Sequence, residues 1–196
     1  GVFSSSLKDL DMRLLDDYLM RVYGKHLEEF DVSDNQLLQN LRILTDTNQL
    51  TLAGLLFFGK SPQNFKPSFM VKAVSFYGND MGGTSYRDSK DFYGTIPELF
   101  EQGMSFLKSN LHSVQAGQSF NSVGKLEISE IALEEILQNA LVHRQYIKTA
   151  PIRIMIFDNR VEIVSPGHLP DGMSVEEIRY GNTFQRNPLI AAFCAK

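Results

Sequence analysis

Three polar residues whose types can bind a cation and position water recur at helical spacing in the second half of the chain. Glu135, Asn139 and His143 stand four residues apart, in a stretch whose pattern predicts a helix over 129–144. Since an α-helix turns by about 100° per residue, these side chains fall within an arc of roughly 80°. An amide oxygen is a ligand for hard cations such as Mg²⁺, and a carboxylate can position water. The opposite side carries apolar residues that would face a core: Leu133, Leu137, Ala140 and Leu141.

The same stripe has a structural interpretation. Its polar groups would then form hydrogen bonds to a neighbouring hairpin, and His143 with Arg144 would fix the connection from the helix to the sheet. From residue types and spacing alone, both interpretations stay open.

The stripe resembles the N-box of the GHKL ATPases, which is a Glu-x-x-x-Asn motif on a helix. That family includes gyrase, the ninety-kilodalton heat-shock chaperone, histidine kinases and mismatch-repair ATPases. Three segments, Asn139-Ala-Leu-Val-His-Arg144, Ile163-Val-Ser-Pro-Gly167 and Arg186-Asn-Pro188, resemble a narrower group. These are bacterial transcriptional regulators, also described as divergent AAA or ATP-dependent DNA helicase-related proteins. Full-length members carry an AlbA-like (Schlafen-type) DNA-binding domain first and usually a winged helix last.

The resemblance implies an ATP site with Mg²⁺. Asn139 would bind the Mg²⁺ ion, and Glu135 would be the catalytic residue that orients the attacking water in a hydrolysing member. The other nucleotide-binding residues would be His143, Ser165, Gly167, Arg186 and Asn187. Gly167 and its neighbours would border the base. Arg186 and the helix that starts after Asn187 would face phosphates, because a helix N-terminus favours anions.

The chain departs from the family pattern at two places, and the first of them puts adenine specificity in doubt. GHKL proteins use an Asp to accept the adenine amino group, whereas this chain has Ser165 or Pro166 at that place. A hydroxyl makes a weaker contact than a carboxylate. No Gly-x-Gly-x-x-Gly segment occurs, so the second glycine box of the family is missing. Arg186 also has a plainer interpretation, as a surface arginine beside a helix cap formed by Asn187.

The predicted fold class is α+β, with a helical subdomain over 1–66 and a GHKL-like (Bergerat-like) two-layer α/β sandwich over 67–196. Apolar spacing predicts a helix over 7–24 and further short helices up to residue 58. Alternation predicts a strand over 68–76, an edge strand over 86–93 and a hairpin over 152–164. Asp158 and Asn159 would form the hairpin turn, which explains Asp158 better than a catalytic role. Helices over 95–112 and 129–144 would cover one face of the sheet.

One segment matches the phosphate-binding P-loop pattern letter for letter, from Gly54 to Ser61. A P-loop follows a buried strand and leads into a helix. Here a polar turn precedes the segment, its variable positions are Leu, Leu, Phe and Phe, and Pro62 follows it. We therefore predict a buried helix that ends at Gly59. Further on, Ser174 and Glu177 have the spacing of a capping box for a short helix.

Composition limits the function classes. The chain has 196 residues, 43% of them hydrophobic, and a net charge of −4, which gives this segment no electrostatic reason to bind DNA. The single cysteine, Cys194, excludes an internal disulfide, and no apolar run is long enough for a membrane helix. We expect a cytoplasmic protein. The start at Gly1 without Met and the final helical pattern lead us to expect a segment excised from a longer chain.

The predicted function is an ATP-binding or ATPase-like regulatory module of a DNA-binding transcriptional regulator. DNA would bind through flanking domains, and the chain would form a homo-oligomer without contacting membranes. Hydrolysis, at most a weak ATPase activity, stays open. The alternative is a degenerate, nucleotide-free scaffold that mediates assembly and positions the DNA-binding domains.

Overall fold

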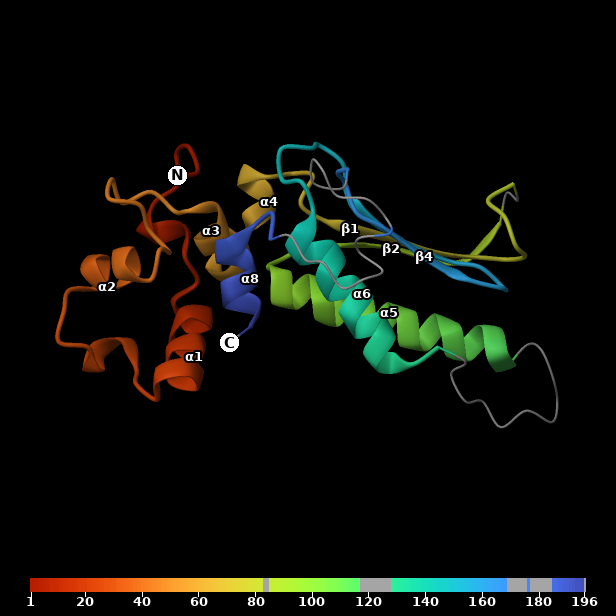
Figure 1. The fold of residues 1–196 in the computed structure, drawn as a ribbon, viewed down its shortest axis with the longest axis horizontal. Helices are drawn as coiled ribbons and strands as arrows, with labels where there is room; N and C mark the ends of the chain where they lie inside the picture. Colours follow the sequence, from red (N-terminus) through yellow and green to blue (C-terminus); the bar gives the residue numbers. More distant parts are fainter. Residues whose placement is uncertain (83–84, 117–127, 169–175, 177–184, 196) are drawn as a thin grey trace. The chain divides into compact units, whose positions relative to one another are not determined.

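The computed structural model describes residues 1–82, 85–116, 128–168, 176 and 185–195 (Figure 1). The chain forms two compact units. The first comprises Gly1–Pro67, Gly94–Pro97 and Leu189–Lys196, and the second comprises Ser68–Tyr93 and Glu98–Pro188. The first segment of the first unit ends at Pro67, and the second unit begins at Ser68. The last helix of the chain belongs to the first unit, although the residues directly before it in sequence belong to the second.

The first unit is helical. Its elements are the 3-10 turns η1 (Leu7–Asp9) and η2 (Leu27–Glu29) and the helices α1 (Met12–Tyr23), α2 (Asp34–Asn40), α3 (Leu52–Phe58), α4 (Pro62–Phe65) and α8 (Pro188–Cys194). The single helix predicted over 7–24 is wrong at its start. Leu10 is extended and forms a β-bridge with Gly59, and the Asp11 carboxylate then caps α1. Gly24 ends α1 in the left-handed conformation, as expected.

Helix α3 contains most of the P-loop-like segment. Its residues from Ala53 to Phe58 are all buried, and the Thr51 side chain caps it by accepting a hydrogen bond from Gly54 N. A Cβ atom on Gly54 would lie 2.3 Å from the Ile43 carbonyl oxygen, so glycine is needed there for close packing. The prediction of a buried helix over this segment is confirmed.

A cluster of aromatic rings holds α8 in the first unit. The Phe193 ring lies 5.6 Å from the Tyr18 ring, 5.3 Å from that of Phe57 and 5.6 Å from that of Phe58, measured between centroids. Such ring pairs add to the free energy gained from apolar burial.

The second unit is built on a four-stranded mixed sheet. Its strands are β1 (Val71–Phe76), β2 (Tyr86–Phe92), β3 (Ile152–Ile156) and β4 (Val161–Val164), in the order β2-β1-β3-β4. β1 pairs with β2 antiparallel and with β3 parallel, and β3 pairs with β4 antiparallel. Buried and more exposed residues alternate along β1 and β3, as the sequence predicts.

Helices α5 (Ile96–Ala116) and α6 (Glu130–His143) lie on one face of this sheet (Figure 1). A Cβ atom on Gly103 of α5 would lie 2.8 Å from Leu137 of α6 and 3.3 Å from Ile154 of β3, so the three elements pack closely. The apolar side of α6 is buried as predicted, at Leu133, Leu137, Ala140 and Leu141. The α+β class and the placement of both helices are therefore confirmed.

The hairpin between β3 and β4 turns at Asp158 and Asn159, where Phe157 N donates to the Arg160 carbonyl (2.9 Å). Asp158 also fixes the turn to the sheet. Its carboxylate accepts hydrogen bonds from Gly78 N (3.0 Å) and from Arg87 Nη2 (2.5 Å). These contacts support the structural interpretation of Asp158.

Two further expectations concern a membrane-spanning helix and the short helix near residue 174. Among the described helices, none has the length and apolar character that a membrane span requires. The short helix predicted near Ser174 and Glu177 lies outside the described residues.

Candidate functional site

The first two residues of the polar stripe, which lie in the middle of α6, face solvent. Glu135 and Asn139 are exposed, whereas His143 is half-buried. Among the described residues, the side chains of Glu135 and Asn139 form no hydrogen bond or ion pair. An exposed carboxylate and an exposed amide therefore lie one helical turn apart.

The C-terminal end of α6 is different, because side chains from outside the helix close it. The last four carbonyls of a helix have no partner within the helix. Each of them accepts a hydrogen bond from a different side chain: Ala140 from Ser165 Oγ (2.8 Å), Leu141 from Tyr146 Oη (2.8 Å), Val142 from Asn187 Nδ2 (2.7 Å) and His143 from Arg186 Nη1 (3.0 Å). The positive charge of Arg186 also suits the negative end of the helix dipole.

Gly167 allows the segment after β4 to lie against this helix end. Its φ is +131°, and a Cβ atom there would lie 2.7 Å from Arg186 Nη1 and 2.9 Å from Gln145 Cβ. Beside it, Gln145 N donates to the Pro166 carbonyl (2.7 Å), and Arg186 Nη2 donates to the His168 carbonyl. Only glycine fits this close approach without a shift of its neighbours.

Arg144 fixes the connection from α6 to β3. It is 1% exposed, and its Nη2 donates to the Ala150 carbonyl (3.0 Å). The guanidinium lies 5.0 Å from the Tyr146 ring and 5.9 Å from the Phe69 ring. Burial lowers the pKa of Arg144, partly offset by Tyr146. The structural role that the sequence allows for Arg144 is thus confirmed.

His143 is kept neutral by its surroundings. Burial lowers its pKa, and the nearby positive charge of Arg186 lowers it further. A neutral imidazole at physiological pH can accept or donate a hydrogen bond but adds no positive charge to attract phosphate.

The predicted site residues therefore divide into two groups. His143, Ser165, Gly167, Arg186 and Asn187 meet at the end of α6, whereas Glu135 and Asn139 lie one or two turns before it. Within the part of the chain that the structure describes, no three His, Cys, Asp or Glu side chains form a metal cluster. Tyr146 is the contributor that sequence reasoning missed, because nothing in its spacing marks it as a partner of Leu141.

Two family models match parts of the chain. The model described as the C-terminal region of a putative ATP-dependent DNA helicase recG matches residues 149–196, and a domain of unknown function matches residues 2–72. No curated protein matches. Among solved structures, the crystal structure of the DIP2311 protein from Corynebacterium diphtheriae is similar, with a TM-score of 0.64 and 20% identity.

The recG-like match over residues 149–196 supports an ATPase-like, helicase-related family. The similarity to the Corynebacterium protein shows the fold alone. That similarity covers 100% of this chain but only 37% of the other, so this chain spans just over a third of its length. The recG-like match begins after α6 and includes Ser165, Gly167, Arg186 and Asn187.

Proposed function

We propose that the second unit is an ATP-binding, ATPase-like module with a GHKL-like arrangement, in which Asn139 on α6 helps to hold Mg²⁺ and the nucleotide phosphates. The observation that carries this proposal is the exposed pair of Glu135 and Asn139, one helical turn apart and without partners among the described residues. The match of residues 149–196 to an ATP-dependent family supports it.

The donor set suits Mg²⁺ bound together with a nucleotide. Mg²⁺ keeps several waters and is held by one or two protein oxygens plus phosphates, so a dedicated metal cluster is not required. The Asn139 amide oxygen would supply one such ligand. Glu135, one turn earlier, would orient a water if the nucleotide is hydrolysed. Bound Mg²⁺ would neutralise phosphate charge.

The capped end of α6 would support the base side of this site rather than bind the base through side chains. Ser165 Oγ already donates to Ala140, so it is committed to the helix end. Of the described groups at this end of α6, the backbone next to Gly167 would then make the contact with the base. We therefore expect weak discrimination between adenine and guanine nucleotides.

Isothermal titration calorimetry with ATP and Mg²⁺ tests the proposal. Replacing Asn139 with Ala removes the cation ligand, and we expect at least about a tenfold loss of affinity. Gln138 is the matched control, because it is exposed on the same helix but lies beside the stripe. Its replacement by Ala should leave the affinity unchanged.

The outcome of this titration also tests the alternative, a nucleotide-free scaffold for assembly. The specific observation in its favour is that Ser165, Arg186 and Asn187 all use polar groups to close α6. Absence of any heat of binding, in this chain and in a longer chain with flanking domains restored, would favour the scaffold. In either case the proposed context is a bacterial transcriptional regulator that binds DNA through other domains.

A further inference from the structure

We propose that β2 is a self-complementary edge strand through which two copies of this chain pair antiparallel, joining their sheets about a twofold axis at Ser89. The inference goes beyond the nucleotide site and does not depend on it.

The position of β2 provides the first argument. It is the outer strand of the order β2-β1-β3-β4, so its other edge has no strand partner among the described residues. Ser89, Lys90 and Asp91 are exposed there. An unpaired strand edge presents backbone donors and acceptors that can bind another strand.

The order of charges along β2 provides the second argument. Its sequence is Tyr-Arg-Asp-Ser-Lys-Asp-Phe, from residue 86 to 92. In an antiparallel pair centred on Ser89, Asp88 of each copy faces Lys90 of the other. Opposite charges directly across two strands stabilise the pair. A twofold axis makes this charge pair occur twice.

The contacts within one chain show which of these charges need a partner. Arg87 is paired with Asp158, and Asp91 with Lys72. The Asp88 carboxylate accepts a hydrogen bond from the Asn110 amide (3.2 Å). In the described part of the chain, neither Asp88 nor Lys90 forms an ion pair. The twofold register supplies a partner of opposite charge to both.

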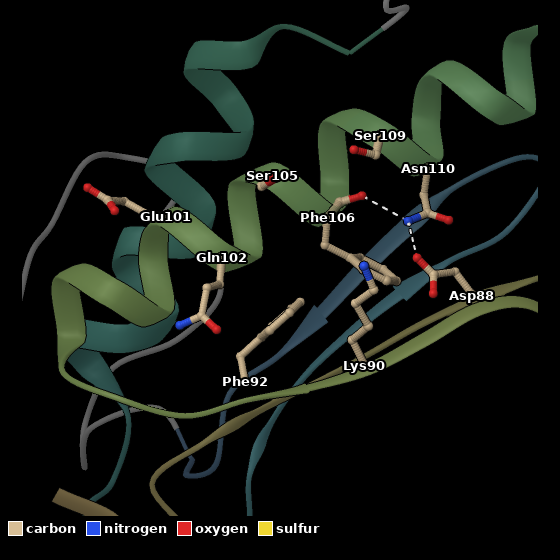
Figure 2. Close-up of a pocket in the computed structure, with 9 residues that line it drawn as sticks. All are labelled: Asp88, Lys90, Phe92, Glu101, Gln102, Ser105, Phe106, Ser109 and Asn110. Carbon is tan, nitrogen blue, oxygen red and sulfur yellow. Dashed lines mark hydrogen bonds between the residues drawn. The ribbon is translucent and has the colours of Figure 1, made fainter. Parts of the chain in front are cut away.

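Asp88 and Lys90 point to the same side of the sheet, toward α5, where they border a hollow of about 300 Å³ (Figure 2). Phe92 and Phe106 form apolar parts of its lining, and Asn110 orients the Asp88 carboxylate. A Lys90 side chain from a second copy would therefore reach an oriented carboxylate at the rim of an open space. No residue of α6 is among those that line it.

Other registers are less favourable. Centring the pair on Lys90 or on Asp88 would place like charges directly opposite, and an in-register parallel arrangement would do so at every charged position. Charged edge strands ordinarily discourage pairing. Here the order of the charges discourages the wrong registers and favours one. The β1–β2 register is irregular next to Arg87, so the regular stretch from Asp88 to Lys90 carries the pairing.

Sedimentation velocity of the chain without nucleotide, at low ionic strength, tests the proposal by charge reversal. The variant K90D should weaken self-association by at least about tenfold, because it places like charges opposite each other twice. The double variant D88K/K90D exchanges the two charges and should restore association to within about threefold of the natural chain. Circular dichroism checks that each variant is folded.

Disulfide trapping tests the register. In the proposed pair the two copies of residue 89 are directly opposite, within the Cα separation that a disulfide needs, whereas the copies of residue 91 are far apart. Ser89 and Asp91 are both exposed, so S89C should form a covalent dimer with an oxidant and D91C should not. Cys194 contributes little background, because burial raises its pKa to about 11 and the thiolate is the reactive form.

Three results would overturn the proposal. The first is a chain that stays monomeric at about 0.5 mM, where even a millimolar interface would be partly occupied. The second is a dimer that K90D leaves unchanged or that D91C traps as fast as S89C. The third is a monomeric chain that binds a strand of a different protein in a manner sensitive to K90D, because the occupant would then not be a second copy.

Discussion

The middle and the C-terminal end of α6 carry residues of the same motif in opposite situations. Around Glu135 and Asn139 the polar groups are exposed and have no partner among the described residues. At the end of the helix, four carbonyls each accept a hydrogen bond from a side chain that comes from outside the helix. The comparison teaches that a motif read along the sequence mixes residues that close the end of a helix with residues whose side chains are exposed.

The largest effect is expected from removing Arg144, which fixes the connection that follows the capped end of α6. Arg144→Ala should lower the free energy of unfolding by about 3 kcal/mol, because it leaves a cavity and an unpaired Ala150 carbonyl. Urea denaturation measures this change. Arg153, exposed on β3, is the control, and its replacement by Ala should cost less than about 0.5 kcal/mol. Equal costs at both positions would mean that Arg144 does not secure the connection from α6 to β3.

A smaller effect is expected at Gly167. Gly167→Ala should destabilise the chain by about 2 kcal/mol, since it combines a positive φ with a contact to Arg186. Gly78 separates the two causes. It has a φ of +84°, but a methyl group there would meet no atoms within 4 Å, so Gly78→Ala should cost only about 1 kcal/mol. A cost at Gly167 that is no greater than at Gly78 would contradict the close packing described above.

The smallest effect concerns the pH dependence of stability. His143 has a lowered pKa in the folded state, so the unfolded chain binds more protons as the pH falls below about 6.5. The contribution of His143 to the free energy of unfolding is therefore complete above that pH, and it is lost as the pH falls toward the lowered pKa of the folded state. His26 has the opposite sign, because its hydrogen bond to Asp16 raises its pKa, and its contribution is lost as the pH rises through that raised value.

Unfolding midpoints measured from about pH 5 to about pH 8 check this prediction. The variant His143→Gln should flatten the decrease in stability at low pH, whereas His26→Gln should flatten the decrease at higher pH. A decrease at low pH that is as steep in His143→Gln as in the natural chain would show that the burial of His143 is not its cause.

The local elements of this chain were predictable from its sequence, because their causes are local. The apolar side of α6, the alternation in β1 and β3 and the turn at Asp158 all follow from residue spacing. The buried helix over the P-loop-like segment followed from its four large apolar residues. The break at Leu10 was not predictable in this way, because it depends on pairing with Gly59, which lies far along the chain.

The organisation of the site was only partly predictable for the same reason. Ser165, Gly167, Arg186 and Asn187 were identified through a family resemblance, but the hydrogen bonds that join Ser165, Arg186 and Asn187 to α6 span 25 to 45 residues of sequence. No periodicity encodes which helix carbonyl a side chain will meet. The placement of α8 in the first unit likewise depends on contacts of Phe193 with rings from two other helices.

Thermal unfolding of two asparagine variants, with and without Mg²⁺ and ATP, tests the central claim most directly. Asn187→Ala removes a cap of α6 and should lower the melting temperature while leaving the stabilisation by nucleotide intact. Asn139→Ala should leave the melting temperature of the free chain unchanged and clearly reduce the stabilisation by nucleotide, in line with the roughly tenfold loss of affinity expected above. An equal loss of intrinsic stability in both variants, or full stabilisation by nucleotide in Asn139→Ala, would contradict the division of α6 into a capped end and a binding middle.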